Sequence, residues 1–377
     1  MSGAEDIALG PIPYVDLSRQ FDEERDELLA VVTEALARGD WVGGAAVGEL
    51  ERALSEFHGG LEAVALNSGT DALALALKGL GVGPGDEVIT PANSFFASTA
   101  AVVQAGATPV LVDVLPDQNM DPKAAERAIT PRTRAIMPVH LTGRMGDMDA
   151  LMAVAEAHGL KVVEDAAQSI GSAHRGRLAG TIGDAGCFSA HPLKNLNACG
   201  DAGFLVTRDA EMAARLRRLR NHGMVDRNTV AEFGIVSRLD TLQAAILLMR
   251  LKRLPGVIER RRRNARLYRD LLDPAHVFMP AEREEAFDTH HTFVIQVDRR
   301  DELQAHLAAQ GIGTGIHYPI PIHLQPAAAR LGYREGDFPA VEAQARRILT
   351  LPVNQFMTPD DIARVARAVN RFFGSAR

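Results

Sequence analysis

Apolar and polar residues along the first half of the chain follow a pattern that predicts strands and helices in turn. Short apolar runs predict a strand ending near residue 66 and further strands over 87–91, 107–114, 134–140, 161–167, 185–191 and 202–208. Helical patterns cover 70–80, 95–106, 124–129 and 148–159. The strand runs are almost continuously apolar, as in strands buried on both faces. We therefore predict an α/β fold built from βαβ units around a mostly parallel, doubly wound sheet.

The pattern changes after about Asp209. Long helical stretches cover 211–223 and 241–273, and a strand pattern at 289–297 is followed by helical patterns at 302–311 and 359–373. This succession predicts a smaller C-terminal α+β domain. We place the boundary near Pro255, with a large domain and its N-terminal arm over 1–254 and a small domain over 255–377.

Composition narrows the possible partners. The chain has 377 residues, of which 46% are hydrophobic and 24% charged, with a formal net charge of −7. These values are ordinary for a soluble chain of more than one domain, and the negative charge argues against a nucleic-acid partner. The arginine run at 260–263 is interpreted as a solvated helix face. No signal peptide or membrane span is recognisable, and two cysteines, Cys187 and Cys199, suit a reducing cytoplasm.

Two predicted strand ends carry groups that could bind a charged ligand. Gly69 and Thr70 begin a helix, and the free N–H groups of a helix N-terminus suit a phosphate. The alternative is an ordinary helix start capped by Ser68 or Thr70. Asp165 ends an apolar strand, where a carboxylate requires a cation such as a protonated pyridine nitrogen. The alternative is that Asp165 caps the next helix.

Lys194 is the third candidate. The chain has five lysines, and Lys194 alone follows a buried strand in a loop rich in Asn and Gly. An amine whose pKa is lowered by burial can form a Schiff base, which arginine cannot. The alternative is a solvated loop lysine. The glycine-rich segment 79–85 follows a helix and precedes a strand, the reverse of a dinucleotide-binding loop, so we interpret it as a helix end and turn.

Together these segments resemble the DegT/DnrJ/EryC1/StrS family of pyridoxal-5′-phosphate (PLP) dependent sugar aminotransferases. The resemblance runs from residue 40 almost to the C-terminus. It rests on motifs that occur in the family's order: NSGTDAL, VITPANSFFAST, GATPVLVDV, PVHLTG, VVEDAAQSIGS, FSAHPLKNLNACGDAG, RNHG, SRLDTLQAAIL and IHYPIPIHLQP.

The resemblance implies the fold of fold-type I PLP-dependent transferases and a role for each matching position. Lys194 would carry the cofactor as a Schiff base and move the substrate proton, and Asp165 would keep the pyridine nitrogen protonated. The remaining implied cofactor-binding residues are Gly69, Thr70 and Ser189 for the phosphate, Phe95 stacking on the ring, and Gln168 near the ring hydroxyl. The residues implied on the substrate side are His317, Tyr318, His323 and Arg238.

The implied activity is transfer of an amino group from an amino acid, L-glutamate in our prediction, to a keto-sugar linked to a nucleotide. Two half-reactions in one site predict ping-pong kinetics. The resemblance also implies amino-sugar and polysaccharide biosynthesis in the cytoplasm by a homodimer with active sites at the subunit interface. Relatives usually carry an asparagine at position 236 that reaches the cofactor phosphate of the neighbouring subunit. Val236 stands there instead, and Ser237, Arg238 or Asn228 could replace its hydrogen bond.

Alternatives remain open at this point. A PLP-dependent sugar dehydratase shares the scaffold but replaces the lysine with histidine, whereas Lys194 is present. A non-catalytic regulatory relative would be expected to lose Lys194, Asp165 or Gln168. A nicotinamide-dependent oxidoreductase would need a phosphate fingerprint that the sequence lacks. We expect no metal, because His317 and His323 are six residues apart with no accompanying ligand pattern.

Overall fold

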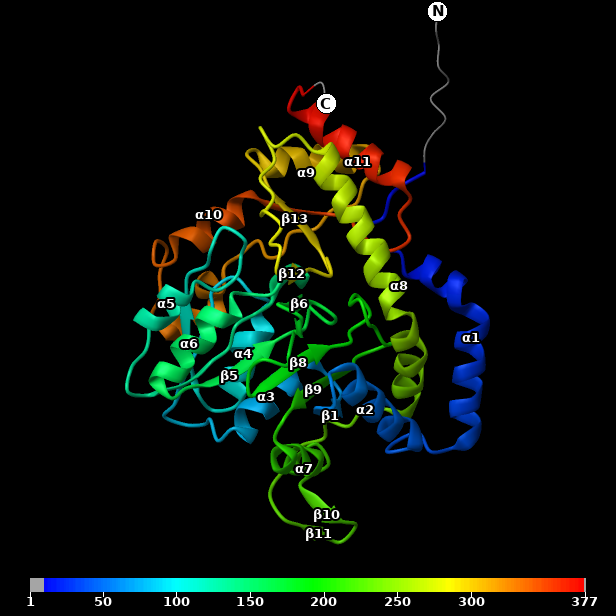
Figure 1. The fold of residues 1–377 in the computed structure, drawn as a ribbon, viewed down its shortest axis with the longest axis vertical. Coiled ribbons are helices and arrows are strands. Elements are labelled where there is room, and N and C mark those ends of the chain that lie inside the picture. The colour runs from blue at the N-terminus through cyan, green and yellow to red at the C-terminus, as the bar shows by residue number, and fades with distance from the viewer. Residues whose placement is uncertain (1–9, 376–377) are drawn as a thin grey trace, which may run out of the picture.

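The computed structural model describes residues 10–375, and its centre is a seven-stranded sheet (Figure 1). The strand order is β1-β9-β8-β5-β4-β2-β3. Every neighbouring pair from β8 to β3 is parallel, and β9 alone runs antiparallel to its neighbours. The predicted mostly parallel sheet is confirmed. The strands are β1 (Glu62–Leu66), β2 (Glu87–Pro91), β3 (Thr108–Val112), β4 (Thr133–Ile136), β5 (Lys161–Asp165), β8 (Ala185–Ser189) and β9 (Gly203–Thr207).

Helices cover both faces of this sheet, as the doubly wound prediction requires. Successive residues of a strand point to opposite faces. In β5, Val162 packs in a core with α2 (Ala45–Phe57), α6 (Met148–His158) and α8 (Thr241–Leu271). Val163 packs in a second core, on the other face, with α3 (Gly69–Gly79), α4 (Phe96–Gln104) and α7 (Ala210–Leu219). The two cores hold the carboxyl ends of the parallel strands in one row.

A third core joins the C-terminal elements. It includes Ile12, near the start of the described chain, with Tyr268 of α8 and residues of the remaining C-terminal elements. Those elements are α9 (Arg300–Ala309), β13 (Phe293–Gln296), β14 (Ile348–Leu351) and α11 (Pro359–Phe372). The helix α8 continues across Pro255 and places Leu254 in the first core. Our domain boundary at 254/255 therefore falls inside one helix and stays a prediction.

Several elements lie outside the sequence predictions. The helix α1 (Leu17–Arg38) lies beside α8 (Figure 1) and buries only Glu24, Leu28 and Ala35, so its apolar pattern is weak. The predicted strand 289–297 begins later, at Phe293 of β13. The predicted short helix at 124–129 is present as α5 (Pro122–Arg127), displaced by two residues. Further unpredicted elements are α10 (Pro339–Arg347), the short strands β6 (Ala173–His174), β7 (Arg177–Leu178), β10 (Met224–Asp226), β11 (Thr229–Val230) and β12 (Ala286–Phe287), and 3-10 turns at Leu141–Gly143, Ile322–Leu324 and Pro326–Leu331.

Within residues 10–375, no helix is long and apolar enough to cross a membrane.

Candidate active site

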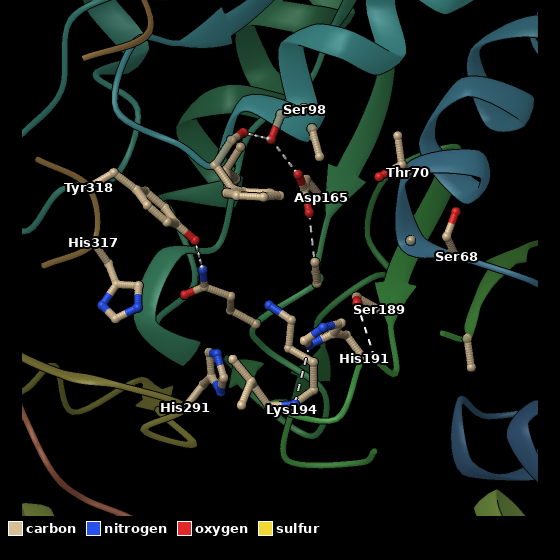
Figure 2. A pocket seen from close by; sticks show the side chains of 18 of the residues that line it. Ser68, Thr70, Ser98, Asp165, Ser189, His191, Lys194, His291, His317 and Tyr318 are labelled. Carbon is tan, nitrogen blue, oxygen red and sulfur yellow. Dashed lines mark hydrogen bonds between the residues drawn. The ribbon is translucent and has the colours of Figure 1, made fainter. Parts of the chain in front are cut away.

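A cavity of about 360 Å³ opens at the carboxyl ends of the sheet strands. The end of β5 contributes Asp165, the end of β8 contributes Ser189, and the following loop contributes Lys194. Figure 2 shows the Asp165 and Lys194 side chains entering this cavity from different sides, with Ser68 and Thr70 of the α3 start along one flank and His317 and Tyr318 along the other. The sequence-predicted residues of three separate segments therefore share one cavity, as the geometry of open α/β sheets requires.

Asp165 is a buried carboxylate with two hydrogen-bond donors. Ser98, in the first turn of α4, donates to Oδ2 at 2.7 Å, and the backbone N–H of Ala167 donates to Oδ1 at 3.2 Å. Burial raises the pKa of Asp165, while these donors and the charge of Lys194 act to lower it. Asp165 is therefore a carboxylate whose anionic form needs a cation in the cavity.

Glu164, the acidic residue that precedes Asp165 on β5, has a structural role. Glu164 faces the opposite side of the sheet, where it accepts hydrogen bonds from the backbone N–H groups of Gly180, Ile182 and Gly183 at 2.7–2.8 Å. Its Oε2 also lies 2.9 Å from Nε2 of His140. Burial acts to raise the pKa of Glu164, but His140 and the backbone donors hold it below its ordinary value. Glu164 thus fixes the 180–183 turn against the end of β5.

Lys194 has the properties that a reactive amine requires. Its backbone N–H donates to the carbonyl oxygen of His191 at 2.8 Å, which fixes the loop after β8. Burial lowers the pKa of Lys194 to about 8, and the charge of Asp165 partly opposes that shift. A substantial fraction of this amine is therefore neutral near physiological pH, which is the form that attacks a carbonyl carbon.

The start of α3 forms the third wall. Ser68 is the N-cap, and its side chain accepts the N–H of Asp71 at 3.1 Å, as one of the sequence alternatives expected. A Cβ added at Gly69 would lie 2.8 Å from Cβ of Ser189, so only glycine lets α3 approach the end of β8 this closely. Thr70 and Ser189 line the same end of the cavity. The helix start with its hydroxyl groups fits a phosphate.

Aromatic and amide groups surround the space between these ends. Nε2 of Gln168 donates to the Tyr318 hydroxyl at 3.3 Å, and Oε1 of Gln168 accepts the N–H of Thr142 at 2.8 Å. The Phe95 ring lies 5.5 Å from the Tyr318 ring, between centroids. Nδ1 of His317 lies 2.8 Å from the Thr350 hydroxyl, and burial lowers the pKa of His317 to about 4. His317 is therefore neutral at physiological pH.

Two predicted residues lie outside this cavity. His323 is 3% exposed, and its Nε2 lies 2.9 Å from a Glu342 oxygen. Arg238 donates to the side-chain oxygen of Asn221 at 3.1 Å and does not line the cavity. The single chain does not bring either side chain to Lys194, and their substrate-side roles stay predictions.

Other residues reach the cavity without having been predicted from the sequence. The polar ones among them include Ser98, Tyr14, His291 and Arg261. Arg261 corrects our interpretation of the arginine run as a solvated helix face, because its residue exposure is only 7%. It lies on the side of α8 that faces the cavity, whereas Arg260 pairs with Glu23 in the α1 helix. Ser98 could have been predicted, because it is a polar residue in the first turn of a helix that follows a parallel strand. Tyr14 and His291 come from distant segments, and no local sequence signal indicates that they reach the cavity.

The model of the DegT/DnrJ/EryC1/StrS aminotransferase family matches residues 22–370. The chain belongs to this family. It is 43% identical over 366 residues to the dTDP-3-amino-3,4,6-trideoxy-alpha-D-glucose transaminase of Streptomyces venezuelae, covering 96% of each chain. It is 42% identical over 363 residues to the UDP-N-acetyl-3-dehydro-alpha-D-glucosamine 3-aminotransferase of Acidithiobacillus ferrooxidans, covering 96% of this chain and 97% of the relative.

A crystal structure of S. venezuelae DesV in complex with a ketimine intermediate superimposes with a TM-score of 0.95 at 42% identity, covering 98% of this chain and all of that one. The resemblance in sequence thus extends to the fold and to most of the chain. The protein is therefore a sugar aminotransferase of this family. This finding sets aside the non-catalytic regulatory protein and the nicotinamide-dependent oxidoreductase as alternatives.

Proposed function

We propose that this family member transfers an amino group from L-glutamate to the C3 ketone of a nucleotide-linked sugar, using PLP bound covalently to Lys194. One observation carries the proposal. Lys194, with a pKa lowered to about 8, and the buried Asp165 enter one cavity whose third wall is a helix N-terminus (Figure 2). An amine, a carboxylate and an anion site are the groups that an aldehyde, a pyridine nitrogen and a phosphate each require.

The residues present fit PLP at each of its polar groups. Thr70 and Ser189 with the start of α3 would hold the phosphate, and Asp165, supported by Ser98, would keep the pyridine nitrogen protonated. Phe95 would lie against the ring, and Gln168 near its hydroxyl. When bound, PLP supplies an electron sink for the carbon that loses its proton. Lys194 would move that proton, because its side chain enters the same cavity and its pKa is lowered to about 8.

The proposal for the sugar rests on what relatives are named for. The names of the S. venezuelae and A. ferrooxidans relatives both place the amino group at C3 of the sugar, which is linked to dTDP in the first and to UDP in the second. The product would serve amino-sugar and polysaccharide biosynthesis. Both half-reactions would use one cavity, so we expect ping-pong kinetics.

A second copy of the chain would complete the site. The segment 225–236 exposes apolar side chains, and Phe233 is fully exposed in the single chain (102%). Figure 1 shows the β10–β11 hairpin of this segment projecting beyond α7. Large apolar side chains in contiguous exposed segments mark interaction surfaces. We propose a homodimer in which this segment, with Val236 and Arg238, contacts the partner subunit.

The free thiols Cys187 and Cys199 support a location in the reducing cytoplasm.

The visible absorption spectrum before and after addition of L-glutamate tests the proposal. We expect a yellow protein whose visible band decreases on addition of L-glutamate and returns when 2-oxoglutarate is added. A Lys194→Ala variant is the control for the covalent bond. Mass spectrometry should then detect amination of a 3-keto dTDP or UDP sugar. A protein that binds no PLP, or whose spectrum is unchanged by every amino acid supplied, would refute the proposal.

A further inference from the structure

Arg261 is a buried cation, and no carboxylate among residues 10–375 pairs with it. It lines the cavity at 7% exposure, and no salt bridge to it occurs in the part of the chain that the structure describes. Arg260 and Arg266 of the same helix are more exposed and pair with Glu23 and Glu259, whereas Arg262 and Arg263 donate to backbone carbonyl oxygens outside the cavity. Burial of an uncompensated charge costs several kcal/mol in general, so such a group usually has an anion to meet.

The hydrogen bonds of Arg261 leave part of the guanidinium unused. Nε donates to the Gln355 side chain at 3.1 Å, and NH1 donates to the carbonyl oxygens of His290 at 3.4 Å and His291 at 2.9 Å. NH2 donates to none of residues 10–375. These contacts fix the plane of the guanidinium and leave its NH2 nitrogen for a ligand in the cavity. A hydrogen bond from an arginine nitrogen to a carboxylate oxygen is charge-assisted and among the stronger ones in proteins.

The position of Arg261 relative to the reactive amine restricts which anion it can meet. His291 is near both residues: its backbone carbonyl accepts a hydrogen bond from Arg261, and burial and the charges of Lys194 and Arg261 all lower the pKa of its ring. The start of α3, with Ser68 and Thr70, lies on a different side of the cavity from His291, which is bonded to Arg261 (Figure 2). Arg261 is therefore close to the place where a substrate amine exchanges with Lys194, and the cofactor phosphate has its own site.

We infer that Arg261 binds the α-carboxylate of the amino-acid donor. This inference rests on the proposed function. The α-carboxylate is attached to the carbon that carries the reacting amine, so it must lie near Lys194 in any productive pose. An acceptor ketone on a neutral sugar ring carries no charge at this place. Arg261 would thus orient the donor in the first half-reaction and have no charged partner in the second.

Three amines separate the possible contacts. L-glutamine keeps the α-carboxylate of L-glutamate and lacks the side-chain carboxylate, whereas 4-aminobutyrate keeps the side-chain carboxylate and lacks the α-carboxylate. The PLP-loaded holoenzyme would be titrated with each, following the visible band, for wild type, Arg261→Gln and Arg261→Lys. The matched control is Arg263→Gln, because Arg263 lies on the same helix, donates to the Met357 carbonyl and does not line the cavity.

In Arg261→Gln we expect the half-saturating concentrations of L-glutamate and L-glutamine to rise on the order of 100-fold, the size of one buried charge-assisted pair. That of 4-aminobutyrate should change less than about threefold, as should that of the keto-sugar with the pyridoxamine-phosphate form. Arg261→Lys keeps the charge, so it should recover part of the affinity for L-glutamate and L-glutamine. These two donors should again be affected more than 4-aminobutyrate. Arg263→Gln should behave as wild type.

Other outcomes overturn the inference. Loss of affinity for L-glutamate alone would assign Arg261 to the side-chain carboxylate, and loss for the keto-sugar would assign it to a sugar-linked phosphate. Equal loss for all ligands, or none, would make it a purely structural residue. If Arg261→Gln does not fold, the donor order in Arg261→Lys decides. Failure of wild type to react with any amino acid would instead refute the proposed function.

Discussion

Replacement of Ser98 by alanine is expected to slow the glutamate half-reaction while leaving PLP bound. The Ser98 hydroxyl donates to Oδ2 of Asp165 at 2.7 Å, with Ser98 1% and Asp165 4% exposed. Burial already raises the pKa of Asp165, and Ser98 is the leading influence that lowers it. Without this donor the anionic carboxylate is less stable, so it holds a protonated pyridine nitrogen less firmly.

The magnitude follows from the type of bond. A buried hydrogen bond to a charged group contributes about 1.5–3 kcal/mol, which corresponds to roughly a 10- to 150-fold lower rate if the full contribution is felt in the reaction. Because the pKa of Asp165 should rise further, the loss should be larger at acidic than at neutral pH. Single-turnover absorbance measurements with saturating L-glutamate across a pH series give both quantities.

Thr99 supplies the control. It is the next residue of α4, is 8% exposed, and its hydroxyl has no hydrogen-bond partner within the described residues. Thr99→Val keeps the shape and removes a hydroxyl of the same helix, so its rate should stay within about twofold of wild type. If Ser98→Ala is no slower than Thr99→Val at any pH, the assignment of Ser98 to support of Asp165 is wrong.

The remaining predictions concern Lys194 and one histidine of the core. Lys194→Ala should fold with an unchanged melting temperature and lose turnover by several orders of magnitude, as measured in a coupled transamination assay; near wild-type activity would refute the mechanism. In the protein freed of cofactor, the rate of covalent PLP attachment should rise with pH around a midpoint of about 8, the lowered pKa of Lys194. Asp165→Asn should move that midpoint lower, because the negative charge of Asp165 partly opposes the lowering of the Lys194 pKa by burial. A midpoint near the ordinary pKa of lysine would show that burial does not lower the pKa of Lys194. Burial lowers the pKa of His58 to about 4, so the unfolded chain binds more protons than the folded one between pH 6.5 and 4, and stability falls as the pH falls. His58 contributes a loss of about 2 kcal/mol between pH 7 and 5, so the loss that urea denaturation measures over this range should be smaller by about that amount in His58→Phe than in wild type.

The sheet and the residues at its edge could be predicted because local signals agreed with the final packing. Asp165 and Lys194 each end or follow a continuously apolar strand, and the carboxyl ends of parallel strands meet at one edge. The family resemblance then assigned roles that periodicity could not. The helix α1 escaped prediction because it buries few residues, and its stripe is correspondingly weak.

Residues from distant segments could not be predicted, for reasons of geometry. Arg261 stands in a run of four arginines, and only the rotation of α8 against its neighbours decides which one is buried. Tyr14 reaches the cavity from the chain before α1, and no local pattern signals that approach. His323 looked equivalent to His317 by its motif, but Glu342 of α10 holds it away from the cavity. Long-range packing decides each case.

The adjacent acids of β5 limit how this strand can vary over evolutionary time. Glu164 reaches three backbone N–H groups of the 180–183 turn and His140, and aspartate in its place would be one methylene too short to meet them. Asp165 fits under Ser98, where glutamate would extend further into the cavity. A chain with Asp at 164 and Glu at 165 would have the same charge, composition and hydropathy. It would nevertheless lose the hydrogen bonds to the 180–183 turn and the carboxylate placed beside Ser98. Aspartate and glutamate are therefore not interchangeable at positions 164 and 165, although such substitutions are usually regarded as conservative.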